Sequence, residues 1–151
     1  PVSILISQVE ALERLVTNVP EAAQNIMDRL WPGKVTLVFF ASAFLPENLT
    51  AGTGKIGIRL PLHPVAKMLL KEAGFPVTAT SANLSGEPGC GRIAEMAESI
   101  LRGADLVLDA GVLAGGIGST VVDVTVFPPK TLREGAVSAE DVQAAALGFP
   151  A

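Results

Sequence analysis

Apolar residues along the chain alternate between short extended runs and stretches with helical spacing. The runs at 2–6, 35–41, 56–60, 76–79, 106–108 and 120–126 predict strands, because they are rich in residues that favour extended backbone. Apolar positions three and four apart predict helices over 9–16, 20–30, 64–73 and 93–101, with a last helix after residue 138. This alternation of strands and helices predicts an α/β fold.

Several of the predicted helices carry specific end signals. Ser7 and Glu10 have the spacing of a capping box, and Ser138 with Asp141 has the pattern of a helix cap. The helix over 64–73 has an apolar face that we expect to point inward, formed by Val65, Met68, Leu69 and Leu70.

Composition narrows the class of protein. The chain has 151 residues, 49% of them hydrophobic, which is enough for one packed core. A net charge of −4 argues against a broad basic surface for nucleic acid. The single cysteine, Cys90, excludes an internal disulfide and any multi-cysteine metal site, and it is consistent with the reducing cytoplasm. No apolar run is long enough to suggest a membrane span.

Three polar loops follow predicted strands. They are the segments 80–91 and 109–119 and the turn around Arg133. The first, within TATSANLSGEPGCG, offers backbone N–H groups and hydroxyls that suit an anion or a nucleotide, although such loops are more often ordinary turns. Because ligands of open α/β sheets collect beyond strand ends, these loops are candidates for one cleft.

The titratable side chains indicate a site that binds and stabilises charged groups, and not one that uses a covalent nucleophile. Arg59 and Arg133 suit either a carboxylate or phosphate ligand or a surface salt bridge. The only histidine, His63, precedes Pro64 and is better explained as a helix start than as a base. Asp109 and Asp123 are candidate ligands for nucleotide-bound Mg²⁺, but the mid-strand position of Asp123 favours the alternative of a structural hydrogen-bonding role. Reactions at phosphate, which depend on orientation and electrostatics, fit this inventory.

Several separated segments together resemble the YrdC family of threonylcarbamoyl-AMP synthases. They are LWPGKVTLV, IGIRLPLHP, TSANLSG, GSTVVDV and TLREGAVSAEDV, in family order over nearly the whole chain. The resemblance implies an open α/β fold, over 1–151 as a single YrdC-like domain, whose twisted mixed sheet is flanked by helices around a cavity. It also implies condensation of L-threonine, bicarbonate and ATP, the last with Mg²⁺, into threonylcarbamoyl-AMP and pyrophosphate. A separate complex would transfer the group to tRNA, which makes tRNA an indirect partner.

The resemblance also assigns expected roles to residues. Ser81 and Asn83 match the phosphate-side pair of the family and are the expected catalytic residues. The expected ATP-binding residues are Lys55, Ser81, Asn83, Gly89 and Arg133, although Lys55 alone suggests only a solvated side chain. The expected threonine-binding residues are Arg59, Ala79 and Ser119.

The chain departs from the family pattern in two places. Gly89, Cys90 and Gly91 stand where hydroxyl residues are usual. Residues 1–5 resemble the stretch that follows the family's KxR motif, and nothing matches that motif or the strand before it. We therefore expect an N-terminally incomplete family member, weak or inactive, whose uncovered sheet edge favours a homodimer. The alternatives are an RNA-binding module, a HypF-like domain that forms carbamoyl-adenylate, and a non-catalytic scaffold.

Overall fold

The computed structural model describes residues 2–113 and 117–148. The chain forms two compact units, of which the first combines Pro1–Ala79 with Gly118–Ala151 and the second is Thr80–Ile117. Each unit is described by itself below. The single domain expected from the sequence stays a prediction.

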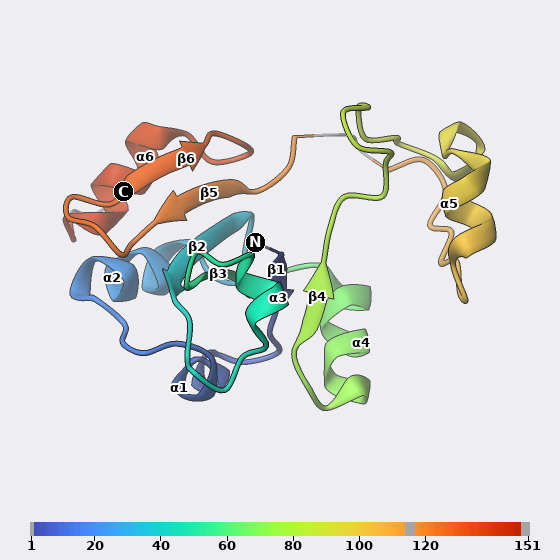
Figure 1. Ribbon diagram of the computed structural model, residues 1–151. Helices are drawn as coiled ribbons and strands as arrows, with labels where there is room; N and C mark the ends of the chain where they lie inside the picture. The colour runs from blue at the N-terminus through green and yellow to red at the C-terminus, as the bar shows by residue number, and fades with distance from the viewer. Residues whose placement is uncertain (1, 114–116, 149–151) are drawn as a thin grey trace. The chain divides into compact units, whose positions relative to one another are not determined.

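A mixed six-stranded sheet forms the first unit (Figure 1). Its strands are β1 (Ser3–Leu5), β2 (Val35–Phe40), β3 (Lys55–Arg59), β4 (Val77–Ala79), β5 (Thr120–Asp123) and β6 (Lys130–Arg133). They are ordered β4-β1-β3-β2-β5-β6. β1 runs parallel to β3 and β2 parallel to β5, whereas the other three pairs are antiparallel. The α/β class and the mixed sheet are therefore as predicted.

The helices of the first unit are short. They are the 3₁₀ turn η1 (Val9–Ala11), α1 (Leu12–Leu15), α2 (Glu21–Leu30), α3 (Glu47–Thr50), α4 (Pro64–Ala73) and α6 (Ala139–Ala146). α2 and α6 pack on one another (Figure 1). The second unit contains the 3₁₀ turn η2 (Ile93–Glu95) and α5 (Glu98–Gly103). Within the described residues, none of the helices has the length and apolar character that crossing a bilayer requires.

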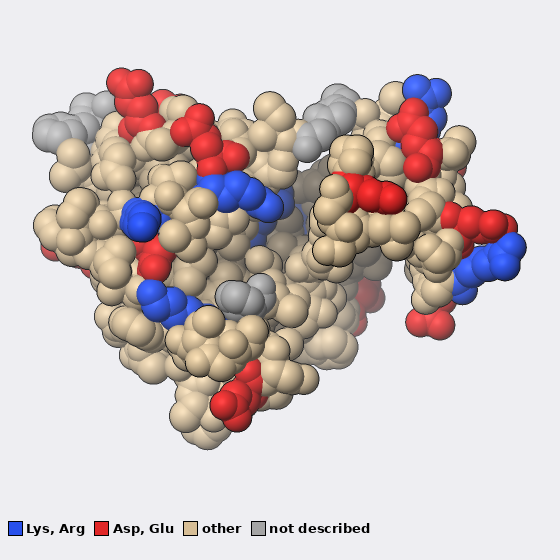
Figure 2. All heavy atoms as spheres, turned by 45° about the horizontal axis from the view of Figure 1, so that its top comes forward, with Lys and Arg blue, Asp and Glu red and all other residues tan. Residues whose placement is uncertain are grey.

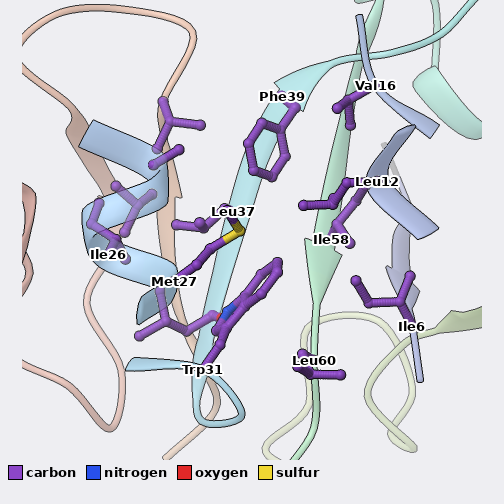
Figure 3. Close-up of a cluster of buried hydrophobic side chains, with 14 of the residues drawn as sticks. Ile6, Leu12, Val16, Ile26, Met27, Trp31, Leu37, Phe39, Ile58 and Leu60 are labelled. Atoms are coloured by element: carbon purple, nitrogen blue, oxygen red, sulfur yellow. The ribbon is translucent and has the colours of Figure 1, made fainter. Parts of the chain in front are cut away.

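The hydrophobic core lies between one face of the sheet and helices α1, α2 and α6. In Figure 3, Met27 of α2 points toward Leu37 of β2, and Leu12 of α1 lies beside Ile58 of β3. Trp31 closes one end of this cluster, and its buried indole N–H donates to the Val35 carbonyl at 2.8 Å. Since side chains alternate along a strand, the residues between these core positions face the other side of the sheet.

The helix-end signals differ in outcome. Ser138 caps α6 as predicted, because its Oγ accepts from the Asp141 N–H at 3.0 Å. The capping box predicted at Ser7 is wrong: the first helical segment is a 3₁₀ turn whose N-cap is Gln8, without a side-chain cap. His63 is the N-cap residue of α4, directly before Pro64, which agrees with a helix start.

Other predictions fail where the predicted apolar stretch is left exposed. The strand expected over 106–108 is absent from the described chain, and Leu106 there is 72% exposed. The helix expected over 93–101 is interrupted, with η2 and α5 in its place. On α4 only Leu70 is buried, whereas Val65, Met68 and Leu69 are exposed. An apolar stripe becomes buried only when another element packs on it, and periodicity does not reveal that partner.

Candidate functional site

Small residues form a row across three strands on the face of the sheet opposite the core. Ser3 of β1 lies opposite Gly57 of β3 on one side and opposite Ala79 of β4 on the other. A Cβ placed on Gly57 would lie 3.1 Å from Ser3 Oγ and 3.2 Å from Thr36 Cγ2. Gly57 is buried, so the contacts of its missing side chain are close ones, and glycine allows Ser3 and Thr36 to approach one another across β3.

Arg59 lies at the end of β3 and is held by a backbone carbonyl. Its Nε donates to the Gly33 carbonyl oxygen at 2.8 Å, while the Gly33 N–H donates to the Leu60 carbonyl at 2.9 Å. The side chain is half-buried, and this burial lowers the pKa of the guanidinium. None of the ion pairs within the described chain involves Arg59. Its two terminal nitrogens are therefore suited to a planar anion such as a carboxylate.

Gly33 is a site residue that the sequence interpretation missed. A Cβ placed on it would lie 2.2 Å from the Leu30 carbonyl oxygen, so only glycine fits at the end of α2. Trp31, Pro32 and Gly33 follow directly after α2, which ends at Leu30 with Trp31 as its C-cap. The same turn also places the carbonyl that orients Arg59. The available signal was the glycine itself, between the predicted helix and the strand that follows it.

Ser119 and Arg133, both predicted site residues, are brought together by the fold. Ser119 Oγ shares a hydrogen bond of 2.8 Å with Thr36 Oγ1 on β2. A terminal nitrogen of Arg133 donates to the Ser119 carbonyl oxygen at 2.8 Å. Arg133 is exposed and, like Arg59, forms no ion pair with a described residue. The face of β3, β2 and β5 opposite the core helices, called the open face below, thus carries the hydroxyls of Thr36 and Ser119, of which Thr36 is buried, together with the Arg133 guanidinium.

Lys55 and Asp123, candidates for ATP and Mg²⁺, bind one another instead. Lys55 Nζ lies 2.9 Å from Asp123 Oδ2 and 5.6 Å from the centre of the Phe40 ring. Burial alone would raise the pKa of Asp123, but hydrogen bonds from Lys55 and Thr125 and the Lys55 charge lower it overall. Lys55 and Arg59 are four residues apart on one strand, about 13 Å. Asp123 thus has the structural role kept as its alternative, and the ATP contact of Lys55 stays a prediction.

The remaining predicted residues belong to the second unit. Asn83 uses its side-chain N–H₂ group within its own turn, donating to the carbonyls of Leu84 at 2.9 Å and Glu87 at 2.8 Å. This arrangement shapes the loop and leaves the Asn83 side-chain oxygen for a ligand. Ser81 and Gly89 are exposed in the same loop. Their phosphate-side roles, and the catalytic roles of Ser81 and Asn83, stay predictions.

The described residues do not form a resident metal site. No group of three or more His, Cys, Asp or Glu side chains is placed to hold an ion in that part of the chain. Asp109, the other candidate, accepts a hydrogen bond from the Gly111 N–H at 2.8 Å and shapes a turn.

Comparison with protein-family models identifies the family of this domain. The model of the Sua5/YciO/YrdC family, described as "Telomere recombination", matches residues 1–135. The chain belongs to this family. It is 35% identical over 143 residues to a threonylcarbamoyl-AMP synthase of Pyrococcus abyssi, covering 95% of this chain and 42% of that protein. It is 36% identical over 151 residues to a putative threonylcarbamoyl-AMP synthase of Mycobacterium tuberculosis, covering 100% of this chain and 69% of that protein.

Solved structures of family members have the same fold. P. abyssi Sua5 complexed with L-threonine superposes with a TM-score of 0.87 at 34% identity, covering 96% of this chain and 43% of that one. Escherichia coli YciO superposes with a TM-score of 0.74 at 26% identity, covering 92% of this chain and 68% of that one. HypF, at 21% identity and a TM-score of 0.70, shares the fold alone. The chain thus spans less than half the length of the P. abyssi protein. The homodimer expected from the sequence finds no support in these comparisons.

Proposed function

We propose that this chain is the substrate-binding domain of an L-threonylcarbamoyladenylate synthase, a nucleotidyltransferase of tRNA modification. The names of its relatives and the threonine-bound structural neighbour support this proposal. The compartment that we propose is the cytoplasm, with the tRNA reached through a separate transfer complex. The HypF-like alternative rests on fold likeness alone.

One observation carries the proposal: Arg59 is a half-buried cation with no ion-pair partner among the described residues. A desolvated positive charge is costly unless an anion accompanies it. The bond from Nε to Gly33 fixes the plane of the guanidinium and leaves a fork for two parallel hydrogen bonds. The α-carboxylate of L-threonine matches this fork.

The other groups of the open face suit the remaining parts of the substrates. The small residues Ser3, Gly57 and Ala79 lie on the strands beside Arg59, and we propose that a small amino acid binds over them. Arg133 and the Ser119 hydroxyl offer a charge and a polar group to phosphate oxygens or to threonine. In the overall reaction one carbon–nitrogen bond forms between bicarbonate carbon and the threonine amine. One oxygen–phosphorus bond forms to the ATP α-phosphate, and pyrophosphate and water leave. The chain's proposed part is to hold these groups in contact.

The Mg²⁺ in this proposal arrives with ATP. Mg²⁺ is usually held by substrate phosphates together with one or two carboxylates and several waters. Asp123 is engaged by Lys55, and no resident metal cluster exists within the described residues.

Direct RNA binding is a weaker alternative. The chain has a net charge of −4. On the face drawn in Figure 2, basic and acidic side chains are interspersed instead of forming one broad basic surface. Non-specific affinity for nucleic acid depends on such a surface.

Calorimetry with the purified chain tests the proposal. We expect saturable binding of L-threonine, abolished in threonine methyl ester, which lacks the carboxylate charge. Incubation with threonine, bicarbonate and Mg·ATP should then be assayed for threonylcarbamoyl-AMP by mass spectrometry. Absence of threonine binding by the folded chain would overturn the proposal. Turnover equal to that of the P. abyssi synthase would overturn the expectation of weak activity.

A further inference from the structure

We propose that Thr120 and Gly135 are positioning residues that fix Ser119 and Arg133 relative to one another. The inference rests on the proposed function, because it gives a role to residues that do not themselves touch substrate. It concerns the junction of two segments, the start of β5 and the turn that follows β6.

The Thr120 hydroxyl is a completely buried hydrogen-bonding centre. It donates to the Val137 carbonyl at 2.5 Å and accepts from the N–H groups of Gly135 at 2.9 Å and Val137 at 3.1 Å. A hydroxyl has one donor and two acceptor lone pairs, so its whole capacity is used. The residue before this centre is Ser119. Thr120 thus ties the Ser119 backbone to the turn after Arg133.

Gly135 allows the two segments to approach closely. A Cβ placed on it would lie 2.3 Å from the Gly118 carbonyl oxygen and 2.6 Å from the Ser119 carbonyl carbon. Since these neighbours are backbone atoms, a side chain could be accommodated only by moving one segment. The Ala136 N–H also donates to the Gly118 carbonyl, at 2.9 Å. Movement of either segment therefore changes the position of the Ser119 carbonyl relative to Arg133, which binds it.

A β-bulge explains why Arg133 lies on the open face. Asp123 is opposite Lys130 and Val122 is opposite Thr131, but Val121 is opposite Arg133, so β6 carries one extra residue there. Without it, Leu132 would be opposite Val121. Opposed residues share a face of the sheet, so the bulge brings Arg133 to the face that carries Thr36, which pairs with Val121. The contacts of Thr120 and Gly135 lie directly after this bulge.

The variants Thr120→Val, Thr120→Ser and Gly135→Ala test the inference through the Kd for Mg·ATP. We expect Thr120→Val and Gly135→Ala to raise this Kd on the order of tenfold to a hundredfold, because small misplacements of binding groups have effects of that size. Thr120→Ser keeps the hydroxyl and should bind within about twofold of the parent chain. Ser138→Ala is the matched control, since it weakens the same segment at the α6 cap without touching Ser119.

Several results would overturn the inference. One is unchanged ATP affinity in folded Thr120→Val or Gly135→Ala, another is failure of Thr120→Ser to rescue binding, and a third is equal loss of affinity in Ser138→Ala. If the variants do not fold, amide hydrogen exchange of the parent chain tests whether the hydrogen bonds to the Thr120 hydroxyl exist. The Gly135 and Val137 amides should be protected, and rapid exchange at both would refute the network. If the parent chain binds no ATP while both amides are protected, the proposed function fails and the network stands.

Discussion

Arg59 and Lys55 occupy the two ends of β3 yet have different surroundings. Lys55 is neutralised by Asp123 of β5, on the far side of β2, whereas among the described residues Arg59 is held by the Gly33 carbonyl alone. A cation with its own counter-ion contributes to the fold, and a half-buried cation without one favours an anionic ligand. The motif resemblance assigned both residues to substrates, and only the contacts distinguish them.

Arg59→Gln should weaken binding of L-threonine. A hydrogen bond to a charged group contributes about 1.5–3 kcal/mol, so we expect the Kd to rise by roughly tenfold to a hundredfold. Calorimetric titration measures this change, with the exposed Arg14→Gln as control. Arg59→Gln should also lose discrimination between threonine and threoninamide. Retained discrimination would show that another group recognises the carboxylate.

Asp123→Asn should destabilise the chain at neutral pH and not in acid. The pKa of Asp123 is lowered in the folded state, so its ion pair contributes above the unfolded pKa of about 3.9 and is lost as the pH falls through the folded value. We expect a loss of about 1–2 kcal/mol in the free energy of unfolding at pH 7. Urea unfolding at pH 7 and at pH 3 measures the difference, with exposed Asp105→Asn as control. An effect that does not shrink at pH 3 would contradict the charge argument.

At the scale of elements, the sequence predicted those features that depend only on residues close together in the chain. Ser138 caps α6 because its hydroxyl and the Asp141 N–H are three residues apart, a local matter. The bulge in β6 could not be predicted from the sequence, because a residue is extra only in relation to its pairing with β5. The apolar stripe of α4 likewise predicted burial that its surroundings do not provide.

Ser138→Ala should destabilise the first unit without affecting the site. Loss of an N-cap hydroxyl costs about 1 kcal/mol. Thermal or urea unfolding measures this loss, and Ser138→Asp should restore most of it because aspartate also caps helices. A change in threonine affinity in Ser138→Ala would indicate that α6 is coupled to the open face.

At the scale of the whole molecule, the order of motifs predicted the family, which the family comparison confirms, and supplied candidate residues whose roles stay predictions. It could not show that Ala79, Ser3 and Gly57 form one row, because strand order and register are non-local. It also missed Gly33 and Thr36, whose importance comes from contacts with Arg59 and Ser119. The open face of the sheet is thus a property of the fold, visible only once the core face is assigned.

The first unit also offers a different concave surface, so the location of binding can be tested. A groove of about 690 Å³ is lined by residues of the first helical segments and the turn after α4, among them Ser7, Glu10, Phe44 and Phe75. Its lining does not include Arg59, Ser119 or Arg133.

Chemical-shift mapping tests the central claim most directly. In a titration of the ¹⁵N-labelled chain with L-threonine, the largest amide shifts should occur at Ser3, Gly57, Arg59 and Ala79. They should saturate with the calorimetric Kd and be lost in Arg59→Gln. Largest shifts at Ser7, Glu10 and Phe75, with the open face unchanged, would contradict the claim that the open face of the sheet binds the substrate.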